Sequence, residues 1–175
     1  MTNQDMKFAP DTIEMKVTGL TIDPFTSMPI IILKDMEEKC ALPIWIGLIE
    51  ASAIATEIEN IKLSRPMTHD LLKNILESSN IKVKRIEVSD LADNTFYSKI
   101  WFSTEKKEFV LDSRPSDAIA LALRCKAPIF VSKSVVEKSR KIDLTEDDSS
   151  DEQRRQKWAE ILENLSPEDF GKYKM

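Results

Sequence analysis

The feature that most constrains the fold of this chain is an order of strand patterns and helix patterns that occurs twice. In each half, three strand patterns precede helix patterns. The strand patterns lie at 13–20, 29–33, 41–47, 81–88, 95–103 and 107–112, and the helix patterns at 50–62, 69–78 and 115–125. Period-2 alternation or short β-branched runs predict strands, and apolar residues three or four apart predict helices. Hairpins alternating with helices predict an α+β fold with an antiparallel or mixed sheet.

The two halves can be aligned with a shift of 65 residues. Ala53-Ile54-Ala55 then falls on Ala118-Ile119-Ala120. Three identities are a chance-level match by themselves, but the matching order of elements makes two similar βββαα halves a working hypothesis. A short strand at 127–131 and a short helix at 132–140 complete the second half.

The length of 175 residues suits one compact domain with an appended tail. We predict a disordered lead-in at 1–12, one domain at 13–140, and an acidic linker with a C-terminal helix at 141–175. In that helix one face carries apolar side chains, and a single helix cannot bury its own apolar stripe. We therefore predict a homo-oligomer, most simply a dimer. A protein partner for the tail, or packing of the tail on its own core, would cover the stripe equally well. The stripe consists of Trp158, Ile161, Leu162 and Leu165.

Charge and cysteine content exclude several classes of protein. The net charge is −5, and residues 141–175 carry most of it, with 6 basic against 10 acidic side chains. The remainder is nearly neutral, so the chain lacks the basic excess of a general nucleic-acid binder. Cys40 and Cys125 have no metal-ligand spacing and form no disulfide scaffold. The longest apolar run, at 41–49, is too short to span a membrane, and the first residues do not resemble a secretory signal. These features predict a cytoplasmic protein.

Two Arg-Pro turns place polar groups at the start of a helix. Asp112-Ser113-Arg114-Pro115-Ser116-Asp117 leads into a helix that is apolar on every side. Arg65-Pro66-Met67-Thr68-His69-Asp70 leads into another helix, with Thr68 as its expected N-cap and with the single histidine of the chain. A helix start offers free N–H groups and a positive dipole end. Each turn is therefore either a set of capping residues or a place where a phosphate or metal is held.

Glu50 is the third candidate. Glu50 and Glu57 lie at the edge of the apolar stripe formed by Ile54 and Ile61 in the first predicted helix. Carboxylates in this position lie either at the margin of the core or in a cleft.

Four separated segments, in order, resemble the bifunctional nuclease family of bacterial proteins and plant basal-defence proteins. They are LPIWIGLIEASAIATEI, RPMTHDLL, TFYSKIWF and LDSRPSDAIALALRCKAPIFV. The resemblance covers about Ile13 to Glu137. It implies an α+β core and a nuclease that acts on both RNA and DNA.

We therefore expect a hydrolase that cleaves phosphodiester bonds with divalent-metal assistance, as both an RNase and a DNase with little sequence preference. His69 would be the general acid or base and Asp70 would orient it. The expected metal ligands for Mg²⁺ or Mn²⁺ are Glu50, Asp112 and Asp117, and the two aspartates are also candidate catalytic residues. The candidate phosphate-binding residues are Arg65, Thr68, Arg114 and Ser116.

The alternative function is a non-catalytic module that binds an anion or small ligand, or that regulates a partner protein. The near-neutral core favours this alternative over a general nucleic-acid binder. A redox enzyme using Cys40 and Cys125 has no supporting neighbours in the sequence.

Overall fold

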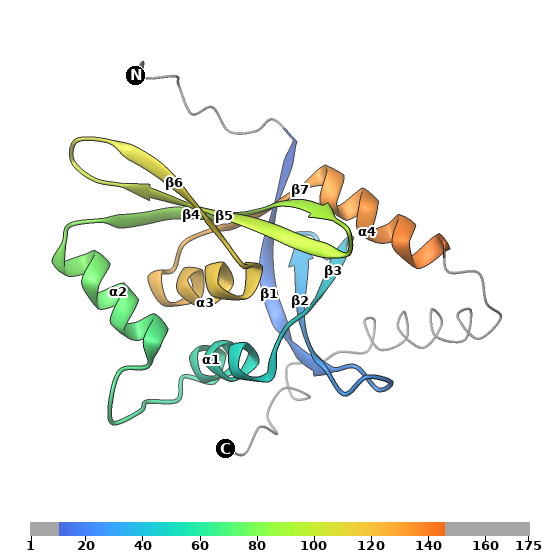
Figure 1. The fold of residues 1–175 in the computed structure, drawn as a ribbon, viewed down its shortest axis with the longest axis horizontal. Coiled ribbons are helices and arrows are strands. Elements are labelled where there is room, and N and C mark those ends of the chain that lie inside the picture. Colours follow the sequence, from blue (N-terminus) through green and yellow to red (C-terminus); the bar gives the residue numbers. More distant parts are fainter. Residues whose placement is uncertain (1–10, 146–175) are drawn as a thin grey trace.

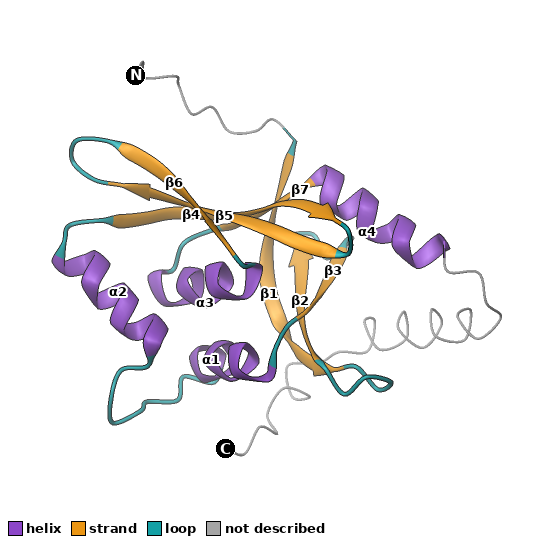
Figure 2. Ribbon diagram, viewed as in Figure 1, coloured by secondary structure: helices purple, strands orange, loops and turns teal. Residues whose placement is uncertain are grey.

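A computed structural model describes residues 11–145 as a mixed sheet with four helices (Figure 1). The strands are β1 (Thr12–Ile22), β2 (Pro29–Asp35), β3 (Ala41–Trp45), β4 (Lys82–Ala92), β5 (Thr95–Ser103), β6 (Glu108–Ser113) and β7 (Ile129–Ser132). The helices are α1 (Leu48–Ile58), α2 (Thr68–Ser78), α3 (Pro115–Cys125) and α4 (Lys133–Thr145). Figure 2 shows how these elements alternate along the chain.

The seven strands form one sheet in the order β3-β2-β1-β7-β4-β5-β6. Two antiparallel three-stranded units flank β7, which pairs antiparallel with β1 and parallel with β4. The predicted α+β fold with a mixed sheet is confirmed.

The similarity of the two halves stays a hypothesis. In both halves the third strand, β3 or β6, lies at an edge of the sheet and leads directly into a helix. The halves then differ, because α2 follows α1 directly whereas β7 separates α3 from α4. The short strand and helix predicted after residue 126 are therefore present, but they break the βββαα order.

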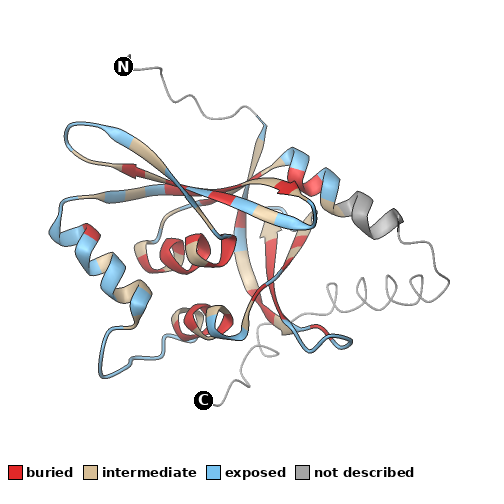
Figure 3. Cartoon of the chain, viewed as in Figure 1, coloured by how far each residue is buried: buried red, intermediate tan, exposed pale blue. Residues whose placement is uncertain are grey.

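Helix α3 lies at the centre of the helical layer. It contacts α1, α2, β4 and β5, whereas α4 contacts β4 and β7. Residues 118–122 of α3 are all buried, as an all-round apolar helix requires. Among the helices, Figure 3 shows the buried residues concentrated in α1 and α3. This burial fixes the position of the first turn of α3, where candidate site residues lie.

Several boundaries differ from those predicted. Strand β4 continues to Ala92 because a register shift after Val88 lets the hairpin extend to a tight turn. The turn residues Asp93 and Asn94 both have positive φ, as two-residue hairpin turns require. Helix α2 is capped by Met67, and Thr68 is its first helical residue, so the predicted N-cap at Thr68 was wrong by one position.

Helix α1 begins at Leu48, two residues earlier than predicted, since Gly47 adopts the extended conformation of an N-cap. The predicted tail helix at 157–165, with its apolar stripe, lies outside the described residues, as does most of the predicted lead-in. Within residues 11–145, every helix is too short or too polar to cross a bilayer.

Candidate functional site

The first turns of three helices meet at one place in the structure. Glu50 lies in the first turn of α1, His69 in that of α2 and Asp117 in that of α3, while Arg114 is the N-cap residue of α3. We call these four residues the polar cluster. Carboxylates in a first turn are favoured by the helix dipole, so the local sequence places these acids where the helices begin.

Arg114 connects two of the helix starts. Its Nε and Nη2 donate to the Asp117 carboxylate at 2.7 and 3.2 Å, and its Nη1 donates to Glu50 Oε1 at 2.9 Å. These bonds, those to Asp117 first, raise the pKa of Arg114 above its usual value. The side chain is still 66% exposed. A guanidinium has five N–H donors, so two remain for a ligand.

His69 is the second partner of Asp117. Its Nε2 lies 3.3 Å from Asp117 Oδ1, and its side chain is mostly buried. Burial alone would raise the pKa of Asp117, but hydrogen bonds from Arg114 and His69 outweigh burial and lower the pKa. The ionised carboxylate can only accept, which assigns the proton of the contact to His69 Nε2. Within the described part of the chain Nδ1 has no hydrogen-bond partner, so in the neutral ring it is a base.

Gly47 makes room for the Glu50 side chain. A Cβ atom at position 47 would lie 2.1 Å from Glu50 Oε2, closer than two such atoms can approach. Glu50 therefore folds back over the N-cap residue of its own helix while it binds Arg114. A side chain at 47 would therefore force this carboxylate to move from its present position.

Asp70 has partners outside the polar cluster. Its Oδ1 accepts from Arg124 Nε at 2.6 Å, and its Oδ2 accepts from the Met67 backbone N–H at 2.8 Å. Burial alone would raise the pKa of Asp70, but these hydrogen bonds outweigh burial and lower it. The hydrogen-bond partner of the His69 ring is thus Asp117 and not Asp70, which holds the start of α2 against α3.

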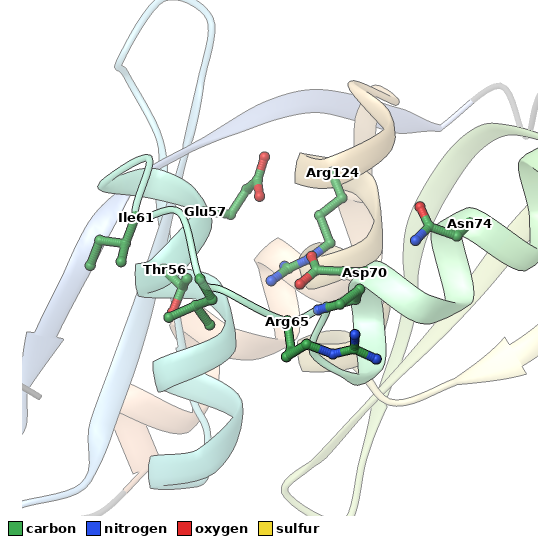
Figure 4. A pocket seen from close by; sticks show the side chains of 9 residues that line it. Thr56, Glu57, Ile61, Arg65, Asp70, Asn74 and Arg124 are labelled. Atoms are coloured by element: carbon green, nitrogen blue, oxygen red, sulfur yellow. The ribbon is translucent and has the colours of Figure 1, made fainter.

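The other predicted site residues are distributed as follows. Asp112 is exposed on the edge strand β6, where it pairs in register with Lys99. Thr68 is exposed and Ser116 is buried in the first turn of its helix. Arg65 is exposed and lines a pocket beside Asp70 and Arg124 (Figure 4). The structure therefore joins Glu50, His69, Arg114 and Asp117 into one cluster and leaves the remaining candidates outside it.

The expected metal ligands do not form a ligand set in this arrangement. Between residues 11 and 145, no three His, Cys, Asp or Glu side chains are placed to share an ion. The Arg114 guanidinium bonds both Glu50 and Asp117, so a cationic group already binds the carboxylates that a metal would need. Asp112 lies on β6, outside the first turns of the helices, and in the described region it bonds neither of these carboxylates.

Arg124 and Gly47 are functional candidates that the sequence analysis missed. Arg124 sits in the last turn of an apolar helix, where a charged residue is normally interpreted as exposed. Its side chain is only 2% exposed. The position of Arg124, a charged residue in an otherwise apolar helix, is a sequence signal that could have identified it. The residues around Gly47 give no comparable signal of its contact with Glu50.

Comparison with known proteins identifies the family. Residues 31–143, well over half of the chain, match the bifunctional nuclease domain. The chain belongs to this family.

Two relatives from Mycobacterium tuberculosis strains, described only as uncharacterized proteins, are each 33% identical over 165 residues, covering 90% of this chain and 97% of theirs. Bifunctional nuclease 1 of Oryza sativa subsp. indica is 30% identical over 97 residues, which is 54% of this chain and 29% of the rice protein. Bifunctional nuclease 2 of Arabidopsis thaliana is 30% identical over 95 residues, or 53% of this chain and 29% of the plant protein. The similarity to these two plant proteins thus covers less than a third of their length.

Proposed function

We propose that this protein is a nuclease that hydrolyses phosphodiester bonds in RNA and DNA at the polar cluster. Membership of the bifunctional nuclease domain family and the names of its plant relatives support this activity. One observation carries the assignment to the cluster: the Asp117 carboxylate bonds both a histidine and an exposed arginine. A base and a phosphate-binding cation are thereby held beside each other.

His69 is the general base of the proposed reaction. With Nε2 bonded to Asp117, its Nδ1 takes a proton from a water molecule as that water attacks phosphorus. Asp117 holds the ring in this tautomer and stabilises the positive charge that the ring acquires. Water serves as the nucleophile because DNA lacks the 2′-hydroxyl that could attack in RNA. The bond to the leaving oxygen then breaks, and that oxygen takes a proton from solvent water. The proton on His69 Nδ1 passes to solvent, which restores the base.

Arg114 binds the phosphate. Its two remaining N–H groups face solvent and can donate to the non-bridging oxygens, whose negative charge grows during attack. Glu50 and Asp117 fix the plane of the guanidinium beforehand, so little ordering is needed when substrate binds.

Assistance by Mg²⁺ or Mn²⁺ stays a prediction from the sequence, and no step above depends on it. Dialysis against EDTA followed by addition of each ion tests it. Asp112→Asn separates a metal-assisted route from the route through Arg114, because Asp112 belongs to the predicted ligand set and lies outside the polar cluster. A loss of turnover as large as that of Asp117→Asn, restored by excess metal, would support the predicted metal ligands. A loss of turnover of less than about threefold would support the route through Arg114.

The experiment that tests the proposed activity compares His69→Ala, Asp117→Asn and the unaltered chain on labelled RNA and single-stranded DNA. We expect each substitution to lower turnover by at least about a hundredfold, as loss of a general base does. Glu105→Gln, which removes an exposed carboxylate in the turn between β5 and β6, is the charge-matched control. Equal cleavage by all four proteins after identical purification would mean a contaminating nuclease. The anion-binding module would then be the better assignment.

We further propose that the protein is cytoplasmic and forms a dimer. Support for the dimer comes from exposed apolar side chains near the β3–α1 junction, where Leu48 is 64% and Ile49 80% exposed. Light scattering at micromolar concentration should give twice the chain mass of 20.0 kDa, and Ile49→Glu should give the monomer mass. A monomer mass for the unaltered chain would reject the dimer.

A further inference from the structure

A pocket of about 230 Å³ lies between α1, α2 and α3, and its lining includes none of the four residues of the polar cluster (Figure 4). Polar side chains from all three helices line it, together with apolar Ile61, Leu63 and Pro66. The polar lining residues are Thr56, Glu57, Arg65, Asp70, Asn74 and Arg124. The proposed hydrolysis does not use this pocket.

A buried cation forms one wall of the pocket. Arg124 donates through Nε to Asp70 and through Nη1 to the Ala120 carbonyl oxygen, at 2.6 and 3.0 Å. Its side chain is 98% buried, since 2% is exposed. Its Nη2 has no hydrogen-bond partner among the described residues, although it belongs to a side chain that lines the cavity. A buried guanidinium with an unused donor favours a ligand that presents an acceptor there.

A carboxylate in the same pocket complements the Arg124 donor. Glu57 is half-buried in the pocket wall, and its side-chain carboxylate has no hydrogen bond or ion pair within residues 11–145. Arg65 and Arg124 carry two positive charges, and Glu57 and Asp70 carry two negative charges, so the lining is formally neutral. A neutral lining with both donors and acceptors favours a ligand edge that itself carries donors and acceptors over a bare anion.

The volume of the pocket suits the base of a nucleotide and is too small for a whole nucleotide. Drug-sized ligands occupy pockets of about 300–1,000 Å³, so this smaller cavity suits a single ring system. Ile61, Leu63 and Pro66 offer apolar surface for the face of a flat ring. Guanine has two adjacent N–H donor groups, which a single carboxylate accepts in bidentate fashion, next to one carbonyl acceptor.

We propose that this pocket is a base-binding subsite that prefers guanine. The Glu57 carboxylate accepts from guanine N1–H and N2–H, and Arg124 Nη2 donates to guanine O6. Exposed Arg65 and Asn74 at the rim contact the sugar and phosphate.

The inference rests on the proposed nuclease function in one respect. His69 and Asp70 are consecutive residues, one in the polar cluster and the other in the pocket wall. A base in the pocket would therefore belong to a nucleotide next to the phosphate at the cluster. A guanine-preferring subsite would differ from the little sequence preference that the sequence analysis predicts.

The test is equilibrium binding of the four ribonucleoside 5′-monophosphates to the full-length chain by titration calorimetry. We expect the guanine nucleotide to bind at least about tenfold more tightly than the other three. Glu57→Gln should reduce this preference to less than about threefold. Glu59→Gln, which neutralises an exposed carboxylate two residues away and outside the pocket lining, is the matched control and should retain the preference.

Binding is measured without cleavage, so the result is independent of the nuclease test. Equal affinity for all four nucleotides, or no binding of any, would overturn the subsite even if His69→Ala abolishes cleavage. A guanine preference that Glu57→Gln leaves intact would also overturn it. Selective, Glu57-dependent binding by a chain that cleaves nothing would support the pocket and reject the nuclease.

Discussion

The two Arg-Pro turns have similar sequences and different surroundings. At the start of α3, Arg114 bonds Asp117 of its own helix and Glu50 from α1. At the start of α2, Arg65 is exposed at the pocket, and Asp70 bonds Arg124 instead. The arginine that balances Asp117 is thus exposed, whereas the one that balances Asp70 is buried.

This difference separates two roles for the same kind of ion pair. An exposed pair costs little to rearrange and contributes little to stability, so Arg114 is available to a substrate. A pair with one buried partner is costly to break, because the remaining charge is left without a partner. The α3 turn therefore suits ligand binding, and Asp70 in the α2 turn chiefly holds two helices together.

The largest effect should come from removing the buried guanidinium. Arg124→Met removes the donor to Asp70 Oδ1 and the side-chain donor to the Ala120 carbonyl oxygen, and should lower the free energy of unfolding by about 3 kcal/mol. Arg114→Met removes an exposed side chain and should cost about 1 kcal/mol or less. Urea denaturation followed by circular dichroism measures both.

If the α3 turn binds substrate and the α2 turn is structural, activity should depend on Arg114 although stability depends little on it. Arg114→Met should lower turnover strongly while the protein stays folded. If Arg114→Met proved the more destabilising substitution, the division into a binding turn and a structural turn would be wrong.

The second largest effect on stability should come from acid, which protonates the Asp70 carboxylate in the α2 turn. The pKa of Asp70 is lower in the folded protein than in the unfolded chain, where an aspartate titrates at about 3.9. The stabilisation is complete above that value and is lost as the pH falls through it toward the folded pKa. Thermal unfolding midpoints should therefore fall below about pH 4.

Asp70→Asn tests the source of this acid sensitivity. The variant should be less stable at pH 6 and should show a smaller drop between pH 5 and pH 2.5. Asp23 and Asp117 also have lowered pKa values and will contribute to the remaining drop. An unchanged pH dependence in Asp70→Asn would show that the Arg124 pair has no part in it.

The smallest effect concerns Gly47. Gly47→Ala should displace the Glu50 carboxylate, loosen Arg114 and lower turnover by about tenfold, with little change in the unfolding midpoint because a flexible side chain can move aside. The double variant with Glu50→Ala is the control, since Gly47→Ala should have no further effect there. An equal loss in both backgrounds would mean that the glycine acts through the backbone.

Local patterns in the sequence determined most of the elements and, to within about two residues, the starts of the helices. Strand alternation, the apolar helix at 118–122 and the Arg-Pro turns depend on neighbours a few residues apart, so they could be predicted. Boundaries were less predictable. The Met67 cap and the extension of β4 to Ala92 depend on single hydrogen bonds and a register shift that no periodicity records.

Only the tertiary structure decided which helix starts meet. The contacts Glu50–Arg114, Asp70–Arg124 and His69–Asp117 join residues 64, 54 and 48 positions apart. The sequence supplied the right residue types, and it paired His69 with Asp70 because they are adjacent. On a helix, consecutive residues point in directions about 100° apart, so neighbours in the chain face different partners. The packing of α1, α2 and α3 chose those partners, and it is this packing that separates the polar cluster from the pocket.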